Sequence, residues 1–300
     1  MQMTVRPILA AALCLGLSSP LPAAAGEVLD RIIERGTIKV GLRTDTPPFA
    51  FIEDGEPRGF TAELCGMMAG AVLLTSDLEA LDAEVSKVTA ENRFEKLTNG
   101  EIDVLCGATT VTLSRRETMS FTLPIFSTGV GAMLSADAPA LMKEVLIDGG
   151  PASRSANAIR EVLKDQRLGV RAGTTAEDWM KAEIIPNVEG VTMVAVDDHE
   201  EGIGGVGDGT LDVYFADKAI LTGILQSAPD GERFLVSRAT YTFEPYALAI
   251  PRGDEDLRLV LDRALSHLYR TGAIFKIYER HFGKPRAAEL IFYGANALPE

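Results

Sequence analysis

Short apolar runs alternate with longer stretches of helical spacing along most of the chain. The segments 37–42 (TIKVGL), 102–107 (IDVLCG) and 212–216 (DVYFA) are rich in aliphatic and β-branched residues, as buried strands are. The stretches 61–74 and 217–227 place apolar residues three and four positions apart, which indicates helices. Because strand and helix alternate, we predict mostly parallel sheets flanked by helices, with right-handed crossovers.

The alternation occurs in two successive units. After the first unit, a second series of strands and helices occupies residues 167–236. An apolar strand at 241–250 is expected to return to the first unit, and two amphipathic helices that break at Gly272 follow it. The chain therefore predicts two α/β lobes that are joined by two extended crossings, with a cleft between the lobes.

The predicted boundaries follow from this pattern. We assign residues 26–130 and 248–300 to lobe 1, residues 131–247 to lobe 2, and residues 1–25 to a signal peptide. Ligands of open parallel sheets bind beyond the carboxyl ends of the strands. The loops that follow the strands should therefore face the cleft, and the polar residues of interest lie in those loops.

The N-terminus shows the three parts of a secretory signal peptide in order. Arg6 is an early cation, residues 8–17 form an apolar core, and Ala23 and Ala25 make an A-x-A cleavage site. The apolar core is too short to span a membrane. A buried N-terminal helix is the alternative. We expect cleavage near Ala25, no lipid anchor, and a soluble mature protein in the periplasm.

The composition is that of an ordinary globular protein. The 300 residues are 46% hydrophobic and 24% charged. The 43 acidic residues outnumber the 29 basic ones, which gives a net charge of -14, and the chain has no run rich in Lys and Arg. This balance excludes the electrostatic footprint of nucleic-acid binding and disfavours an anionic membrane surface.

Two cysteines, Cys65 and Cys106, remain after the predicted cleavage. In an oxidising compartment an even pair favours a disulfide. Two buried free thiols are the alternative, because unpaired cysteines are common in cores. We expect the bridge, provided that the fold brings the two Cα atoms within about 7 Å.

The stretch 103–121 (DVLCGATTVTLSRRETMSF) changes from a buried strand into small and polar residues. Small residues let backbone N–H groups approach a ligand, and Thr110 and Thr112 add hydroxyl groups. Arg115 offers a planar guanidinium that suits a carboxylate, whereas Arg116 is expected to be solvated. We interpret this loop as an anion site, with a solvated polar turn as the alternative.

Two later loops offer complementary groups. In 170–178 (VRAGTTAED), Thr174 or Thr175 precedes a helix whose N-terminus favours an anion. Asp217 ends a predicted strand, where its carboxylate is suited to an ammonium group. Simple capping of the following helices is the alternative for both loops.

Five blocks, in this order, resemble the family 3 periplasmic solute-binding proteins, which serve ATP-driven importers of polar amino acids. They extend over about residues 36–283 and read IKVGLRTDTPPFAF, AENRFEKLTNGEIDVLCGATTVTLSRRETMSF, VRAGTTAE, DVYFADKAIL and YRTGAIFKIYERHFG. The resemblance implies the type II periplasmic binding protein fold, whose lobes close on one amino acid by hinge motion. It also implies a membrane permease of an ABC importer as partner.

The matched blocks imply the roles of individual residues. Arg115 and Thr110, with Thr175 from the other lobe, would hold the α-carboxylate of the ligand, and Asp217 would hold its α-ammonium group. The full set of predicted ligand-binding residues is Arg43, Arg93, Ala108, Thr110, Arg115, Thr174, Thr175, His199 and Asp217.

The chain looks most similar to the glutamate/aspartate-binding members of this family. The similarity rests on GLR ending at Arg43, AENR ending at Arg93, the pair Asp198-His199, and CGATT at 106–110. In such members two arginines grip the side-chain carboxylate. Two cations in one cleft repel each other unless an anion lies between them, which agrees with that implication.

Other interpretations of these residues stay open. Arg43 could instead form a surface ion pair with Asp45 or Glu53, and Arg93 could pack along a helix. Many relatives carry an aromatic residue near the position of Thr46, where this chain has a small one. We expect Phe49, which follows, to lie in the core.

We predict a binding protein that is not an enzyme, a monomer that holds no cofactor or metal. The three histidines His199, His267 and His281 lack zinc-ligand spacing, and a Cys106–His199 nucleophile pair is disfavoured. The alternatives are a periplasmic cyclohexadienyl (prephenate/arogenate) dehydratase of the same fold, with Glu177 or Asp217 as general acid, and a ligand sensor for a signalling partner.

Overall fold

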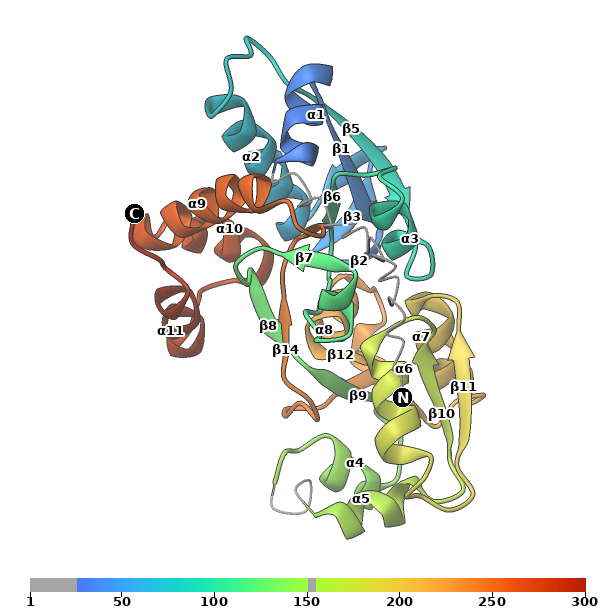
Figure 1. Cartoon of the computed structure of the whole chain (residues 1–300). Helices are drawn as coiled ribbons and strands as arrows, with labels where there is room; N and C mark the ends of the chain where they lie inside the picture. Colours follow the sequence, from blue (N-terminus) through green and yellow to red (C-terminus); the bar gives the residue numbers. More distant parts are fainter. Residues whose placement is uncertain (1–25, 151–154) are drawn as a thin grey trace, which may run out of the picture.

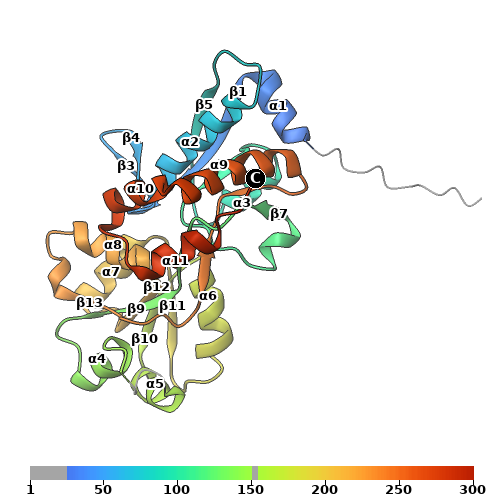
Figure 2. The same ribbon diagram turned by 90° about the vertical axis from the view of Figure 1, so that its left-hand side faces the viewer.

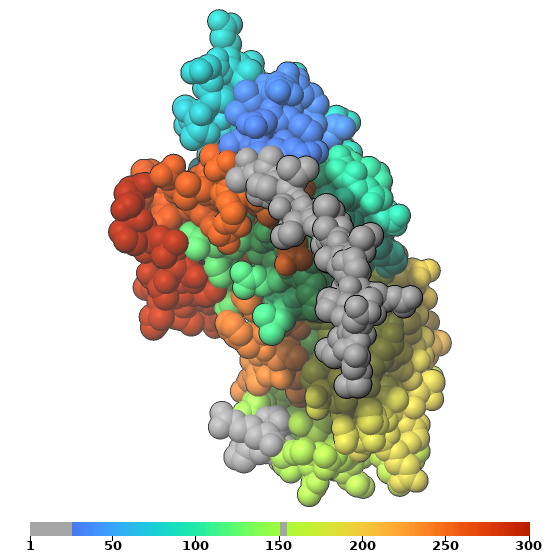
Figure 3. Space-filling model, in the orientation of Figure 1, coloured from blue at the N-terminus to red at the C-terminus, as the bar shows by residue number. Residues whose placement is uncertain are grey.

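A computed structural model describes residues 26–150 and 155–300, so the predicted signal peptide lies outside the described residues. The chain forms two α/β lobes, one above the other (Figure 1). The view turned by 90° shows the same arrangement (Figure 2). In the space-filling view, lobe 1 carries the blue, cyan and red segments, and the yellow and lime segments of lobe 2 lie below it (Figure 3).

Lobe 1 is built on a five-stranded sheet of order β5-β1-β6-β15-β7. These strands are β1 (Thr37–Arg43), β5 (Asp82–Val88), β6 (Val104–Cys106), β7 (Met119–Phe121) and β15 (Ala249–Pro251). A small second sheet contains β2 (Asp45–Thr46), β3 (Ala50–Glu53) and β4 (Glu56–Arg58). The helical segments of this lobe are α1 (Glu27–Arg35), α2 (Phe60–Leu74), α3 (Arg93–Thr98), the 3-10 turn η1 (Arg115–Glu117), α9 (Glu255–Thr271), α10 (Ala273–Phe282) and α11 (Ala287–Ala295).

Lobe 2 is built on a second five-stranded sheet, of order β11-β10-β12-β9-β13. The strands are β9 (Val130–Ser135), β10 (Arg167–Arg171), β11 (Thr192–Val196), β12 (Val213–Asp217) and β13 (Phe234–Val236). The helical segments are α4 (Ala140–Leu146), α5 (Ala156–Leu163), α6 (Thr175–Trp179), the π-helical turn η3 (Met180–Ile184), α7 (His199–Asp208), α8 (Lys218–Ser227) and the 3-10 turn η4 (Gly231–Arg233).

The two sheets share one departure from the predicted parallel arrangement. In each sheet four strands run in one direction, but β15 runs antiparallel to its neighbours β6 and β7, and β9 runs antiparallel to its neighbours β12 and β13. The reason is topological, since β9 and β15 enter their lobes from the crossings and run away from the cleft. The parallel strands β1, β6, β10 and β12 end toward the cleft, as the sequence predicts.

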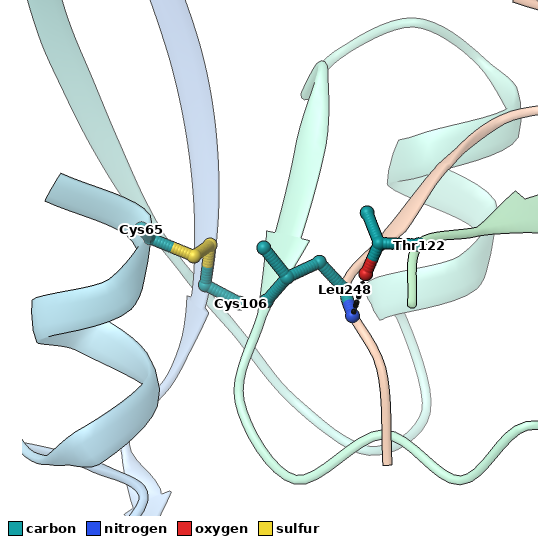
Figure 4. The surroundings of a disulfide bond; sticks show 4 residues. All are labelled: Cys65, Cys106, Thr122 and Leu248. Carbon is teal, nitrogen blue, oxygen red and sulfur yellow. Dashed lines mark hydrogen bonds between the residues drawn. A yellow bond between two sulfur atoms is a disulfide. The ribbon is translucent and has the colours of Figure 1, made fainter. Parts of the chain in front are cut away.

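The two crossings pair with each other as a short antiparallel ribbon of β8 (Phe126–Thr128) and β14 (Glu244–Tyr246). The apolar strand predicted at 241–250 is thus two strands, β14 and β15, separated by Ala247 and Leu248. The two residues between β14 and β15 are hydrogen-bonded to lobe 1. Ala247 N donates to Thr109 O at 3.1 Å, and Leu248 N donates to Thr122 Oγ1 at 3.2 Å (Figure 4 shows the second bond).

An aromatic cluster fills lobe 1 next to the crossings. Phe49 is fully buried, as predicted, and its ring lies 4.9 Å from Phe126, 5.1 Å from Tyr246 and 5.3 Å from Phe282 between centroids. Burial of each such ring stabilises the fold by roughly 1.5–3 kcal/mol. The cluster anchors both β8 and β14, so the crossings start from a rigid base.

The C-terminal helices confirm the predicted pattern in part. Helices α9 and α10 meet at Gly272, which has a φ of 72°. The tail forms α11 and packs on lobe 1 through Tyr293, which is 1% exposed and donates its hydroxyl proton to Ile125 O at 2.9 Å. Ile291 of the same helix is 71% exposed.

Cys65 and Cys106 are joined by a disulfide (Figure 4), with a Cα–Cα distance of 6.4 Å. The bond connects α2 with the last residue of β6. Cys106 immediately precedes the loop 107–110, so the disulfide fixes the start of that loop against the core of lobe 1. Within residues 26–150 and 155–300, no helix is both long and apolar enough to cross a membrane.

Candidate ligand-binding site between the lobes

The two lobes touch along the predicted cleft. Arg93 of α3 donates from Nη2 to Gly173 O at 3.1 Å, and Arg171 of β10 donates from Nη1 to Glu91 Oε1 at 2.5 Å. Gly173 has a φ of 68°, and an added Cβ would lie 3.3 Å from the Ala90 carbonyl oxygen. A larger residue at 173 would therefore strain the turn and push the lobes apart.

The polar residues at this contact fall into two groups. The group next to the crossings, here called the hinge end, comprises Thr110, Arg115, Thr175, Asp217 and Glu244. The other group, here called the arginine end, comprises Arg43, Asp45, Arg93, Arg171 and His199.

At the hinge end, Arg115 begins the turn that follows β6. Its Nη1 donates to Thr110 O at 2.8 Å, and its guanidinium lies 4.8 Å from the centroid of the Phe94 ring. Burial lowers the pKa of Arg115, while the nearby Glu244 raises it. The hydroxyl group of Thr112 is used within the same turn, because its Oγ1 lies 3.0 Å from Ser114 Oγ and accepts from Arg115 N at 3.1 Å.

Asp217 is the last residue of β12 and precedes α8, but its side chain does not cap that helix. Its Oδ1 is buried and has no hydrogen-bond partner among the described residues. Burial raises the pKa of the Asp217 carboxyl, the Glu244 carboxylate adds to the rise, and the value reaches about 7. A helix cap would need neither the burial nor the unpaired oxygen, which favours the ligand-binding interpretation.

Glu244 is a residue of the hinge end that the sequence prediction missed. It lies on β14, is 4% exposed, and accepts through Oε2 from Thr110 Oγ1 at 2.7 Å and from Thr175 Oγ1 at 2.6 Å. Its Oε1 accepts from Thr242 Oγ1 at 2.9 Å. The signal in the sequence was a lone carboxylate inside the apolar stretch YTFEPYALAI, since buried charges need partners.

Two further predicted ligand-binding residues, Thr174 and Ala108, lie near the hinge end. Thr174 is the N-cap residue of α6, but its Oγ1 donates to Arg171 O at 2.7 Å rather than capping the helix. Ala108 is 4% exposed and lies in the loop between the disulfide and Thr110. Both lie in cleft-side loops, and the hydroxyl proton of Thr174 is already used within lobe 2.

At the arginine end, Arg43 is 2% exposed and pairs with Asp45 through two hydrogen bonds, from Nε at 2.9 Å and from Nη2 at 2.8 Å. Burial would raise the pKa of Asp45, but Arg43, His199 and Arg171 lower it to about 2. The ion pair with Asp45 that the sequence left open does form, although it is buried. Gly107 makes room for it, since an added Cβ at its φ of 147° would lie 2.9 Å from Arg43 Cβ.

Arg93 is 1% exposed and incompletely paired. Only Nη2 donates to a described residue, and Nε and Nη1 are buried without partners. Its guanidinium lies 4.4 Å from the Phe94 centroid, so the same ring flanks Arg93 and Arg115. Burial lowers the pKa of Arg93, and the neighbouring cation Arg43 lowers it further. Each of these effects is relieved by an anion.

His199 begins α7, directly after Asp198, which caps the helix by accepting from Glu201 N at 2.8 Å. His199 Nδ1 lies 2.8 Å from Tyr214 Oη, and Nε2 is buried with no partner in the described chain. Burial, together with Arg43, lowers the pKa of His199 to about 3, so the ring is neutral at pH 7.

The three arginines of the arginine end outnumber the two carboxylates that pair with them. Arg43, Arg93 and Arg171 contribute three positive charges, and Asp45 and Glu91 contribute two negative ones, with Arg171 Nε 3.6 Å from Asp45 Oδ2. A groove of about 890 Å³ opens beside this end, and both Asp45 and His199 line it.

The buried atoms without partners point to a small polar ligand. They include Arg93 Nε and Nη1, His199 Nε2 and Asp217 Oδ1. Buried polar groups are almost always hydrogen-bonded, so such a cluster needs a partner from outside the chain. The arrangement suits a ligand with a cationic group at Asp217 and an anionic group at Arg93.

Cys106 offers no free thiol for catalysis, because it is in the disulfide with Cys65. Among the described residues, no group of three or more His, Cys, Asp or Glu side chains could hold a metal ion.

Two lobes that meet around buried, oppositely charged groups are typical of a protein that binds a small solute between them. The chain belongs to the bacterial extracellular solute-binding proteins, family 3, whose sequence model matches residues 38–284. This finding confirms the resemblance and the fold class predicted from the sequence blocks.

Individual relatives agree with this assignment. An L-glutamate/L-aspartate-binding protein of Pseudomonas aeruginosa is 28% identical over 269 residues, which covers 88% of this chain and 83% of the relative. A glutamate/aspartate import solute-binding protein of Escherichia coli is 25% identical over 281 residues, covering 93% and 87%. A crystal structure of a mutant ArgBP from T. maritima superposes with a TM-score of 0.70 at 21% identity, covering 86% of this chain and all of that one, and so shares the fold.

Proposed function

We propose that the protein captures an L-amino acid with an acidic side chain, glutamate or aspartate or a related polar amino acid, and delivers it to the permease of an ABC importer. It would act as a monomer in the periplasm, after residues 1–25 have been removed as a signal peptide. The ligand is bound and released without chemical change.

The observation that carries this proposal is the incompletely paired Arg93, at an end of the cleft where three arginines have two carboxylate partners. A side-chain carboxylate between Arg93 and His199 would supply a negative charge and the missing acceptors. Buried charge-assisted hydrogen bonds of this kind contribute about 1.5–3 kcal/mol each. The two relatives named for glutamate and aspartate support the same ligand class.

The hinge end provides the sockets common to all amino acids. We infer that Arg115 holds the α-carboxylate and that Asp217 holds the α-ammonium group, as the family resemblance implies. The ligand then contacts both lobes, so binding favours their closure about β8 and β14. A permease that recognises only the closed shape would therefore bind the protein only when it carries its ligand.

Isothermal titration calorimetry with a panel of amino acids tests the proposal. Glutamate and aspartate should bind most tightly, and a ligand present at 100 times its Kd should stabilise the protein by about 2.7 kcal/mol in thermal unfolding. Binding of arginine or lysine without glutamate would contradict the acidic-ligand assignment. No binding of any amino acid would contradict the proposal as a whole.

One observation favours a second function, dehydration of prephenate or arogenate. A buried carboxyl with a pKa of about 7, as at Asp217, is suited to act as a general acid. Incubation of the purified protein with prephenate, followed by absorbance, decides between the two. Turnover that Asp217→Asn abolishes would establish the enzyme; no turnover by protein that binds glutamate would exclude it.

A further inference from the structure

One carboxylate of the hinge end touches three parts of the chain. Glu244 lies on β14 and accepts from Thr110 of lobe 1, from Thr175 of lobe 2 and from the neighbouring Thr242, at 2.7, 2.6 and 2.9 Å. Thr110 and Thr175 donate to the same oxygen, Oε2. The hydrogen-bonded link between Thr110 and Thr175 therefore passes through a single atom.

The count of hydroxyl protons constrains what Thr110 and Thr175 offer to a ligand. A threonine hydroxyl has one proton to donate and two lone pairs that accept. Both protons are directed to Glu244, so each oxygen faces a ligand only as an acceptor. A carboxylate has no proton to give and finds no partner there. An ammonium group has three protons and no lone pair, so it matches both oxygens.

The charges around Asp217 lead to the same group. Glu244 and Tyr246 approach it from β14, Arg43 from β1 and Arg115 from the turn η1. Asp217 and Glu244 repel each other when both are ionised, and Asp217 Oδ1 is buried without a partner in the described residues. A cation placed between the carboxylates and the two hydroxyl oxygens relieves the repulsion and pairs the free oxygen.

We propose that Glu244 is a positioning residue for the ammonium group of the ligand: it orients the hydroxyl oxygens of Thr110 and Thr175 toward that group and couples its binding to lobe closure. This rests on the proposed function, because it takes the ligand to be an amino acid. It differs from the family-based expectation, in which these hydroxyls hold the α-carboxylate. In the present proposal the α-carboxylate is left to Arg115.

The test compares a ligand with and without its amino group. Glutamate and glutarate share two carboxylates, and only glutamate carries the ammonium. Glu244→Gln should weaken glutamate binding roughly tenfold, because the amide carries no charge and its N–H₂ half cannot accept. Glutarate binding, measured by calorimetric competition, should change less than about threefold. Glu232→Gln, which removes an exposed carboxylate from the same lobe, should leave both unchanged.

A second variant checks that Glu244 acts through a hydroxyl. Thr175→Val removes the hydroxyl at nearly constant volume. If Glu244 orients Thr175, the two substitutions should be non-additive, and Glu244→Gln should lose less affinity in the Thr175→Val background. Circular dichroism of each variant verifies that the protein is folded.

Several outcomes overturn the proposal. Equal losses for glutamate and glutarate would reduce Glu244 to a structural role, and tighter glutamate binding by Glu244→Gln would show that it competes with the ligand carboxylate. A wild-type chain that binds no amino acid would overturn the proposed function and the ammonium role with it. Small-angle scattering of the protein without ligand then still decides the coupling to closure, since Glu244→Gln should be more extended than wild type, and equal radii of gyration would refute the coupling.

Discussion

The hinge end and the arginine end of the cleft differ in how their charges respond to their surroundings. At the hinge end two carboxylates are adjacent, and the pKa of Asp217 is raised to about 7. At the arginine end the pKa of Asp45 is lowered to about 2 and that of His199 to about 3, so both pKa values lie far below pH 7. The first end is adjustable near physiological pH, and the second keeps a fixed charge.

This difference suggests a division of labour within one small site. In the proposed function the hinge end contacts groups that every amino acid has, so changes there should alter affinity for all ligands together. The arginine end is proposed to face the side chain of the ligand, so changes there should alter selectivity. Each prediction below tests whether the two ends are in fact independent, in order of decreasing effect on binding.

The largest effect is expected at Arg115. Replacement by Ala removes the cation proposed for the α-carboxylate, which also interacts electrostatically with Glu244 and Asp217. Glutamate, aspartate and glutamine should all bind more weakly by about 3 kcal/mol, roughly 150-fold in Kd, by calorimetry. The adjacent, exposed Arg116→Ala is the matched control and should bind normally. Normal binding by Arg115→Ala would show that the hinge end is wrongly assigned.

A smaller and selective effect is expected at Arg93. Arg93→Met keeps the buried aliphatic volume but removes the unpaired donors. Glutamate should lose about 2 kcal/mol, roughly 30-fold, because its carboxylate loses charge-assisted hydrogen bonds, whereas glutamine should change only a few-fold. Lys87→Met removes one exposed charge from the same lobe as a control. Equal losses for both ligands would mean that the two ends are not independent.

Much of the fold and several residues of the site could be predicted from the sequence. The loops after β1, β6, β10 and β12 were found because polar residues follow apolar strands, and strand ends meet at one edge of a sheet. Family resemblance then placed Arg43, Arg93 and Asp217 in one cleft, where the structure has them. Local patterns sufficed wherever a residue's environment is set by its own strand or helix.

The missed parts depend on contacts between distant segments. Arg171 enters the arginine end through its bond to Glu91, which lies 80 positions earlier, and through its ion pair with Asp45. Glu244 enters the hinge end through Thr110, 134 positions away, and Thr175, 69 positions away. No local pattern encodes such pairings. The lone carboxylate in an apolar strand, however, was a usable sign, because a buried charge needs partners.

A change of pH should act on the hinge end alone. The ammonium of the ligand binds ionised Asp217, whose pKa in the folded protein is raised from 3.8 to about 7. Below pH 7 the carboxyl is increasingly protonated, so binding must release a proton and affinity falls as pH falls, roughly tenfold between pH 8 and pH 6. The ratio of the glutamate and glutamine Kd values should stay constant over this range, since Asp45 and His199 do not titrate there. A ratio that changes with pH would place a titrating group at the arginine end.

The smallest effect is expected at Tyr214, whose hydroxyl lies 2.8 Å from His199 Nδ1. Burial raises the pKa of Tyr214, so its hydroxyl stays protonated and is able to donate to Nδ1, 2.8 Å away. The neutral ring then carries its proton on Nε2, the buried atom that has no partner among the described residues and that suits a carboxylate. Tyr214→Phe removes the hydroxyl that fixes the tautomer of His199. Glutamate binding should weaken by about 1 kcal/mol, roughly fivefold in Kd, and glutamine binding should not change. Nitrogen-15 NMR of the imidazole measures the tautomer directly. If the proton resides on Nδ1 in the wild type, His199 has no donor to offer and the preference for an acidic side chain rests on Arg93 alone.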